Sequence, residues 1–108
     1  MTEELLLHHR YVCRPGRPIR DCVIEYGVLC ERAGYPEIVR SVGHYLLETA
    51  RWCSGRWPPI NSLAVNRDSR MPGESYDVAP GCSLLNWPDE AQAAIDCVNY
   101  PEHVSDMP

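Results

Sequence analysis

The strongest constraint on the fold is a turn signal at residues 33–36, which separates two stretches of helical hydrophobic periodicity. Before it, apolar residues recur with the three-and-four spacing of one helix face, at Val23, Tyr26, Leu29 and Cys30. Gly34 and Pro36 are stop signals for that helix, and Pro36 also suits the first turn of a second one. The second helix is expected to run to about Cys53 and to present the apolar stripe Ile38, Val42, Tyr45, Leu46 and Ala50. Residues 23–53 therefore predict a helix-turn-helix.

The rest of the chain predicts two further helices and a little β structure. A first helix is expected over residues 1–12, with Thr2 as a possible N-cap and Leu5, Leu6 and Leu7 as its apolar face, ended by the Pro and Gly residues of 14–18. Residues 58–66 predict a short strand, and residues 67–75 predict a turn-rich wing or binding loop. A last helix is expected from near Trp87, stopped by Tyr100-Pro101. The fold class is thus mainly α with a small β element, in a single domain over residues 1–108.

Charge is distributed unevenly along the chain, whose net charge is −5. All ten basic residues are arginines within the first seventy residues, where eight acids leave a net +2. Residues 71–108, an acidic C-terminal extension, carry seven acids and no Lys or Arg, a net −7. A polyanion binder would have to use the first part and hold the second away. Alternatively, the acidic part is itself the binding surface.

Cysteines and histidines provide no recognisable metal or redox motif. The six cysteines have no CxxC spacing, and the acidic start of the chain is unlike a signal peptide, so we expect buried, reduced thiols and a cytoplasmic location. No apolar run is long enough to span a membrane. Four histidines could ligate a metal beside cysteines, but solvated or core roles are the better expectation for His8, His9, His44 and His103. We predict no cofactor and no metal.

The helix-turn-helix segment resembles a known family. Residues 23–29 read Val-Ile-Glu-Tyr-Gly-Val-Leu, residues 33–36 read Ala-Gly-Tyr-Pro, and residues 40–43 read Arg-Ser-Val-Gly. This succession resembles the DNA-binding helix-turn-helix of alkylguanine-DNA alkyltransferases and the non-catalytic alkyltransferase-like proteins, over about twenty residues with the spacing preserved. The resemblance implies a winged-helix-like domain that binds DNA.

The resemblance also implies roles for individual residues. The family's tyrosine falls on Tyr26, and the arginine that enters the duplex and helps to extrude a nucleotide falls on Arg40, followed by Ser41 and Gly43. A planar guanidinium can fill the gap that an extruded base leaves in the stack. The structural alternative makes Arg40 a solvated helix residue and Tyr26 a core anchor.

The family's catalytic segment is not preserved. Where its Pro-Cys-His-Arg should follow the recognition helix, this chain has Pro59-Ile60-Asn61-Ser62, so no thiolate is available to accept an alkyl group and we predict no enzymatic activity. Asn61, Asn66 and Arg67 form a second candidate nucleic-acid-binding cluster, because such side chains suit base-edge or phosphate contacts. Turn chemistry explains Asn66 almost as well.

Two functions from different classes follow from these observations. The first is a non-catalytic nucleic-acid-binding module that uses Tyr26, Arg40, Ser41, Gly43, Asn61, Asn66 and Arg67, with DNA as the partner. The second is a small acidic inhibitor, like the anti-CRISPR proteins of phages and mobile elements, whose residues 71–108 bind the basic surface of a bacterial nucleic-acid-handling defence complex. Arginines on one continuous face would favour the first function. Dispersed arginines beside a contiguous acidic patch would favour the second.

Overall fold

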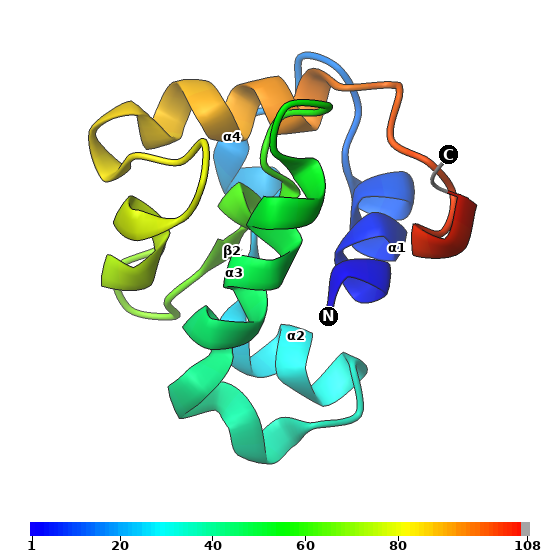
Figure 1. Ribbon diagram of the computed structural model, residues 1–108. Helices are drawn as coiled ribbons and strands as arrows, with labels where there is room; N and C mark the ends of the chain where they lie inside the picture. The colour runs from blue at the N-terminus through cyan, green and yellow to red at the C-terminus, as the bar shows by residue number, and fades with distance from the viewer. Residues whose placement is uncertain (107–108) are drawn as a thin grey trace.

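The computed structural model describes residues 1–106 and has four α-helices, short 3₁₀ helices and one small parallel sheet among them (Figure 1). The α-helices are α1 Thr2–Val12, α2 Tyr26–Arg32, α3 Val42–Cys53 and α4 Trp87–Asp96. The strands are β1 Ile24–Glu25 and β2 Ala64–Val65. The 3₁₀ helices are η1 Ile19–Asp21, η2 Pro36–Ser41, η3 Ile60–Leu63, η4 Glu74–Val78, η5 Leu84–Asn86 and η6 Val104–Asp106. The mainly helical class with a small β element is confirmed.

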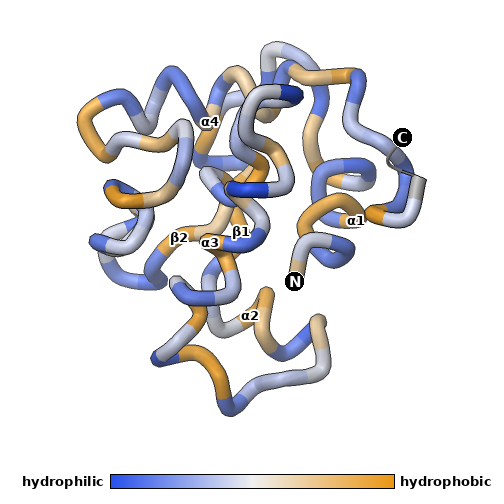
Figure 2. The backbone as a smooth tube through the Cα atoms, viewed as in Figure 1, coloured by the Kyte–Doolittle hydropathy of each residue, from blue (hydrophilic) through white to orange (hydrophobic). Residues whose placement is uncertain are grey.

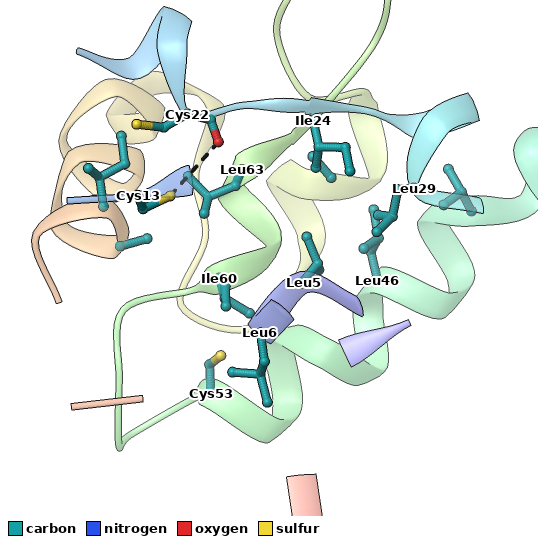
Figure 3. Close-up of a cluster of buried hydrophobic side chains, with 14 of the residues drawn as sticks. Leu5, Leu6, Cys13, Cys22, Ile24, Leu29, Leu46, Cys53, Ile60 and Leu63 are labelled. Carbon is teal, nitrogen blue, oxygen red and sulfur yellow. Dashed lines mark hydrogen bonds between the residues drawn. The ribbon is translucent and has the colours of Figure 1, made fainter. Parts of the chain in front are cut away.

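The buried apolar residues form two clusters, and the main one takes side chains from all four α-helices and from η3 (Figure 3). Leu5 of α1, Leu29 of α2, Ile60 and Leu63 of η3, and Ile95 of α4 are each fully buried. Four of the six cysteines are buried, and all six are free thiols. The prediction of buried thiols is therefore confirmed at Cys13, Cys22, Cys30 and Cys53.

The strand pair differs from the prediction in length and in pairing. β1 and β2 lie parallel, with Ile24 opposite Ala64 and Glu25 opposite Val65, and the crossover between them carries α2, η2 and α3. The prediction of one strand over residues 58–66 is wrong in its length, because η3 occupies 60–63 and the strand β2 has only the two residues Ala64 and Val65. Every residue from 60 to 65 is buried, so this segment has no solvent-exposed face.

Helices lie on both sides of the predicted turn, with boundaries that differ from the prediction. α2 begins at Tyr26 rather than Val23, because Ile24 and Glu25 pair with β2. Gly34 adopts a φ of 87° at the predicted turn, a conformation that glycine tolerates best. Pro36 opens η2, a 3₁₀ helix, and α3 follows only from Val42. The apolar stripe is largely confirmed, because Val42, Leu46 and Ala50 are buried, whereas Tyr45 is exposed.

α1 is confirmed over residues 2–12, but Thr2 does not cap it. Met1 occupies the N-cap position, and the hydroxyl of Thr2 is 2.6 Å from that of Thr49 in α3. Only Leu5 and Leu6 of the three predicted apolar residues are buried. A partner 47 residues away has displaced the local cap, which the sequence could not indicate.

The acidic segment is integrated into the fold and is not an appended extension held away from it. α4 begins at Trp87 as predicted and ends at Asp96, before Tyr100-Pro101. Ala94 and Ile95 belong to the main core, and the indole of Trp87 donates a 2.8 Å hydrogen bond to the carbonyl of Ser62. Residues 71–106 therefore complete the core of the first seventy. The last two residues of the predicted 71–108 extension lie outside the described residues.

Within residues 1–106, no helix combines the length and the apolar character required to cross a bilayer.

Candidate nucleic-acid interface

A groove of about 460 Å³ opens where the start of α2, η2 and the loop after β2 meet, and we call it the α2 groove. Its lining includes three of the seven predicted site residues, Tyr26, Asn66 and Arg67. Tyr26 and Arg67 are 41 positions apart in the chain, and the β1–β2 pairing brings their elements together. The remaining lining is Glu25, Gly27, Val28, Glu31 and Val39.

Tyr26 joins the two sides of this groove. It is half-buried, and its hydroxyl accepts a 2.8 Å hydrogen bond from the backbone N–H of Gly73, just beyond the loop. Burial raises the pKa of this phenol, and the bond from Gly73 opposes the shift only in part. Tyr26 is therefore a neutral side chain whose hydroxyl fixes the far end of the loop.

The loop over residues 66–71 is closed by its own hydrogen bonds. The backbone N–H and side-chain amide of Asn66 both donate to the carbonyl of Met71, at 2.9 and 3.2 Å. Arg70 donates its N–H back to the carbonyl of Asn66 at 3.0 Å and adopts a φ of 59°, which is uncommon for a residue with a side chain. Arg67 projects from this closed loop, with its side chain 83% exposed and only an open contact, 4.0 Å, to Asp68.

Arg40 and Ser41 lie at the end of η2, next to the groove but outside its lining. Both are exposed, and Val39, the residue before them, forms part of the groove wall while remaining 38% exposed. Within η2, the apolar Ile38 and Val39 lie between the charged Glu37 and Arg40, and Figure 2 shows this short hydrophobic stretch at the lower end of the molecule, away from α4. The hydroxyl of Ser41 donates to the carbonyl of Ile38 at 3.3 Å.

Gly43 has a packing role in this structure. A Cβ atom at this position would lie 2.2 Å from Oγ and 2.8 Å from Cβ of Ser75, so α3 and η4 approach each other across the bare backbone. This close approach explains why residue 43 is a glycine, and no ligand contact is needed to explain it.

Asn61 is the one predicted site residue that the structure places in the interior, and its assignment to a nucleic-acid surface is wrong. It is 3% exposed, and its amide nitrogen lies 3.5 Å from the sulfur of Cys82. Its Oδ1 is buried without a hydrogen-bond partner among the described residues. Every residue from 60 to 65 is buried, including both residues of β2, so neighbouring segments cover Asn61 as they cover Ile60.

Sequence reasoning missed several residues around the groove. Glu25 and Glu31 bring carboxylates to the lining, and Val28, 37% exposed, supplies an apolar wall. Arg70 pairs with Glu25 at 3.2 Å on the neighbouring surface. No pattern could have found these residues, because the groove forms between segments that are distant in the chain.

The arginines do not form one continuous face. Residues 14–17 lie against α4, where the N–H of Gly16 donates to Asp96 at 2.8 Å and Gln92 donates to the carbonyl of Arg17 at 3.1 Å. Figure 1 places this loop and α4 at the end of the molecule opposite η2. Arg14 and Arg17 also donate to carbonyls near the end of α1, which is favourable at a helix C-terminus.

Three of the seven acids after residue 71 accept hydrogen bonds within the protein. Glu90 accepts hydrogen bonds from the hydroxyl of Tyr76 at 2.5 Å and from the N–H of Ser83 at 3.0 Å. Asp77 accepts from the N–H of Leu84 at 2.8 Å. The bonds from Gly16 and Gln92 lower the pKa of Asp96. The carboxylates of Glu90, Asp77 and Asp96 are therefore bonded to other parts of the protein.

Histidines and cysteines form no cluster suited to a metal within residues 1–106. The Nε2 atoms of His8 and His9 lie 2.7 and 2.8 Å from the carbonyls of Cys22 and Ala94, and burial lowers the pKa of both rings. His103 lies 3.3 Å from Glu3.

Comparison with family models, curated proteins and solved structures finds no match to this chain.

Proposed function

We propose that the protein is a non-catalytic nucleic-acid-binding module, built as a winged-helix-like domain, that receives an unpaired base in the α2 groove. The observation that carries this proposal is the convergence of Tyr26, Asn66 and Arg67 on one groove beside the exposed Arg40. In this arrangement the closed 66–71 loop takes the place of the wing, and η2 with α3 takes that of the recognition helix.

The lining of the groove suits a base better than a phosphate. Val28 and Val39 offer apolar surface to a base face, and the ring of Tyr26 adds an aromatic wall. Glu25 and Glu31 would repel a phosphate but can accept hydrogen bonds from an exocyclic amine, as carboxylates do from cytosine. Arg67 at the rim and Arg40 beside it are placed for the backbone on either side of that base.

The dispersal of the arginines limits how much nucleic acid can be contacted. Because Arg14 and Arg17 face the other end of the molecule, only a few phosphates can be neutralised near the groove. We therefore propose a short contact with single-stranded or locally opened nucleic acid rather than a long duplex site. The expected salt dependence is shallow, with a log–log slope of roughly −2 for about three phosphates on a single strand.

The alternative, an acidic inhibitor of a nucleic-acid-handling complex, has less support from the described residues. Such an inhibitor needs carboxylates free to face a basic partner. Glu90, Asp77 and Asp96 instead accept hydrogen bonds from within the protein.

Fluorescence anisotropy with labelled single-stranded and duplex oligonucleotides, at two salt concentrations, tests the proposal. We expect binding to single strands that weakens as salt rises, and a loss of about tenfold in both Arg40→Ala and Arg67→Ala. Arg20→Ala, at an exposed position in η1, is the matched control and should bind like the wild type. If the wild type does not bind either oligonucleotide at low salt, the proposal fails and the acidic inhibitor becomes the better account.

A further inference from the structure

A second, smaller pocket lies on the other side of Glu25 and Val28, between α1 and α2, and we call it the α1–α2 pocket. Its volume is about 240 Å³, and its polar lining comprises His8, Glu25, Arg32 and Arg70. Glu25 and Val28 line both this pocket and the α2 groove, so the two are adjacent. The chemistry of the two differs, because the groove has two carboxylates and one arginine whereas the pocket has two arginines and one carboxylate.

The two guanidinium groups come from separate elements. Arg32 is exposed at the end of α2, and Arg70 lies in the closed 66–71 loop. Arg70 pairs with Glu25 through Nη1 at 3.2 Å, but its side chain is 47% exposed and a guanidinium has five donor hydrogens. Donors therefore remain for an anion, and paired guanidinium groups match the geometry of phosphate oxygens.

His8 lines this pocket and has one ring nitrogen without a hydrogen-bond partner among the described residues. The residue is 8% exposed, and its Nε2 donates to the carbonyl of Cys22 at 2.7 Å. Its other ring nitrogen, Nδ1, is buried without a hydrogen-bond partner among the described residues. An unsatisfied buried atom of this kind calls for an explanation, and an anion beside the ring would offset the cost of a proton on Nδ1.

We propose that the α1–α2 pocket is a phosphate subsite, in which Arg32 and Arg70 bind the phosphate that adjoins the nucleotide held in the α2 groove. The proposal that the ligand is a phosphate depends on the residues of the pocket alone. The proposal that this phosphate belongs to a nucleic-acid strand depends on the proposed function. A strand that places a base in the groove would pass over Val28 and bring its next phosphate to these arginines. A free phosphate or phosphomonoester would satisfy the same donors.

NMR titrations with two probes, inorganic phosphate and a five-nucleotide single-stranded DNA, test this subsite in the full chain. We expect both probes to shift the methyl signals of Val12 and Val28 and to raise the pKa of His8, the ring faced by Arg32, Arg70 and Glu25 across the pocket and by Glu4 on its own helix. Arg32→Ala should weaken binding of both probes by about tenfold. Arg70→Gly should do the same without backbone strain, since glycine accepts a φ of 59°.

The outcomes separate this inference from the proposed function. Oligonucleotide binding that depends on Arg40 and Arg67 but is unchanged in Arg32→Ala would overturn the subsite and leave the proposed function standing. If inorganic phosphate shifts the NMR signals of the pocket residues and the oligonucleotide does not, the phosphate subsite stands. Its ligand is then a free phosphate group and not a phosphate of a nucleic-acid strand. If neither probe shifts the pocket signals, or if the control Arg20→Ala loses as much affinity as Arg32→Ala, the subsite is refuted.

Discussion

The α2 side of the molecule and the α4 side use charged residues in opposite ways. Around α4, carboxylates make hydrogen bonds within the protein. Asp96 accepts a hydrogen bond from the N–H of Gly16, and Glu90 accepts one from the hydroxyl of Tyr76. Around α2, Arg32, Arg40 and Arg67 are exposed beside two adjacent cavities. Net charge alone suggests an acidic binding surface in the C-terminal third, but Asp77, Glu90 and Asp96 in that third accept hydrogen bonds within the protein. The predictions below test this division from the largest expected effect to the smallest.

Removing core volume from α4 should be the most damaging change. Ile95 is fully buried, and Ile95→Ala should lower the free energy of unfolding by about 2–5 kcal/mol through lost burial and the cavity left behind. Urea denaturation measures the difference. Leu85→Ala is the control, because Leu85 is 89% exposed and its loss should change stability by less than about 0.5 kcal/mol. Equal effects of the two changes would show that the acidic segment is an appendage after all.

Gly43→Ala tests whether the glycine shared with the alkyltransferase-like pattern is structural. The new methyl group would collide with Ser75, and we expect a loss of about 1–3 kcal/mol in the free energy of unfolding. Gly27→Ala in α2 meets nothing within 4 Å and should be neutral or stabilising by up to about 1 kcal/mol. A stable Gly43→Ala variant with impaired oligonucleotide binding would instead give this glycine a role in binding.

The bond between Tyr76 and Glu90 tests whether the acids of residues 71–106 stabilise the fold. Tyr76→Phe removes the hydroxyl that donates to Glu90 and should lower the free energy of unfolding by about 1–2 kcal/mol. Tyr11→Phe, at a side chain that is 71% exposed, should leave stability unchanged. Thermal denaturation of both variants measures the difference. If Tyr76→Phe is as stable as the wild type, the bond to Glu90 does not stabilise the fold, and this carboxylate is available to a partner.

The smallest expected effect is a dependence of stability on pH at the boundary between the two sides. Burial lowers the pKa of His8 below its ordinary value of 6.5, and the bond to Cys22 only partly opposes this. Below pH 6.5 the unfolded chain therefore binds a proton that the folded chain does not, so stability is full above that pH and declines as the pH falls.

His8→Gln should flatten this decline, because glutamine can still donate to the carbonyl of Cys22 but does not titrate. Burial lowers the pKa of His9 as well, so part of the slope should persist in the variant. Urea denaturation above and below pH 6.5 measures it. An unchanged slope in His8→Gln would assign the whole effect to other groups.

The candidate site was only partly predictable from the sequence. Tyr26 and Arg67 could be singled out, because a resemblance and a turn-rich loop point to them. The sequence could not predict that these two residues meet in one groove, because their meeting depends on the pairing of β1 with β2, which are 40 residues apart. Asn61 was misplaced because neighbouring segments bury the whole 60–65 stretch, and that burial depends on tertiary packing.

The sequence by itself determined that helices form on either side of the turn at Gly34-Tyr35-Pro36 and that a last helix starts at Trp87, because periodicity and these stop and start signals act within a few residues. Only the tertiary structure decided that Thr2 bonds Thr49, that Gly43 contacts Ser75, and that the acidic segment fills the core. Each of these is a contact between segments far apart in the chain. Such contacts are fixed by how complete helices pack together, which no short window of residues encodes.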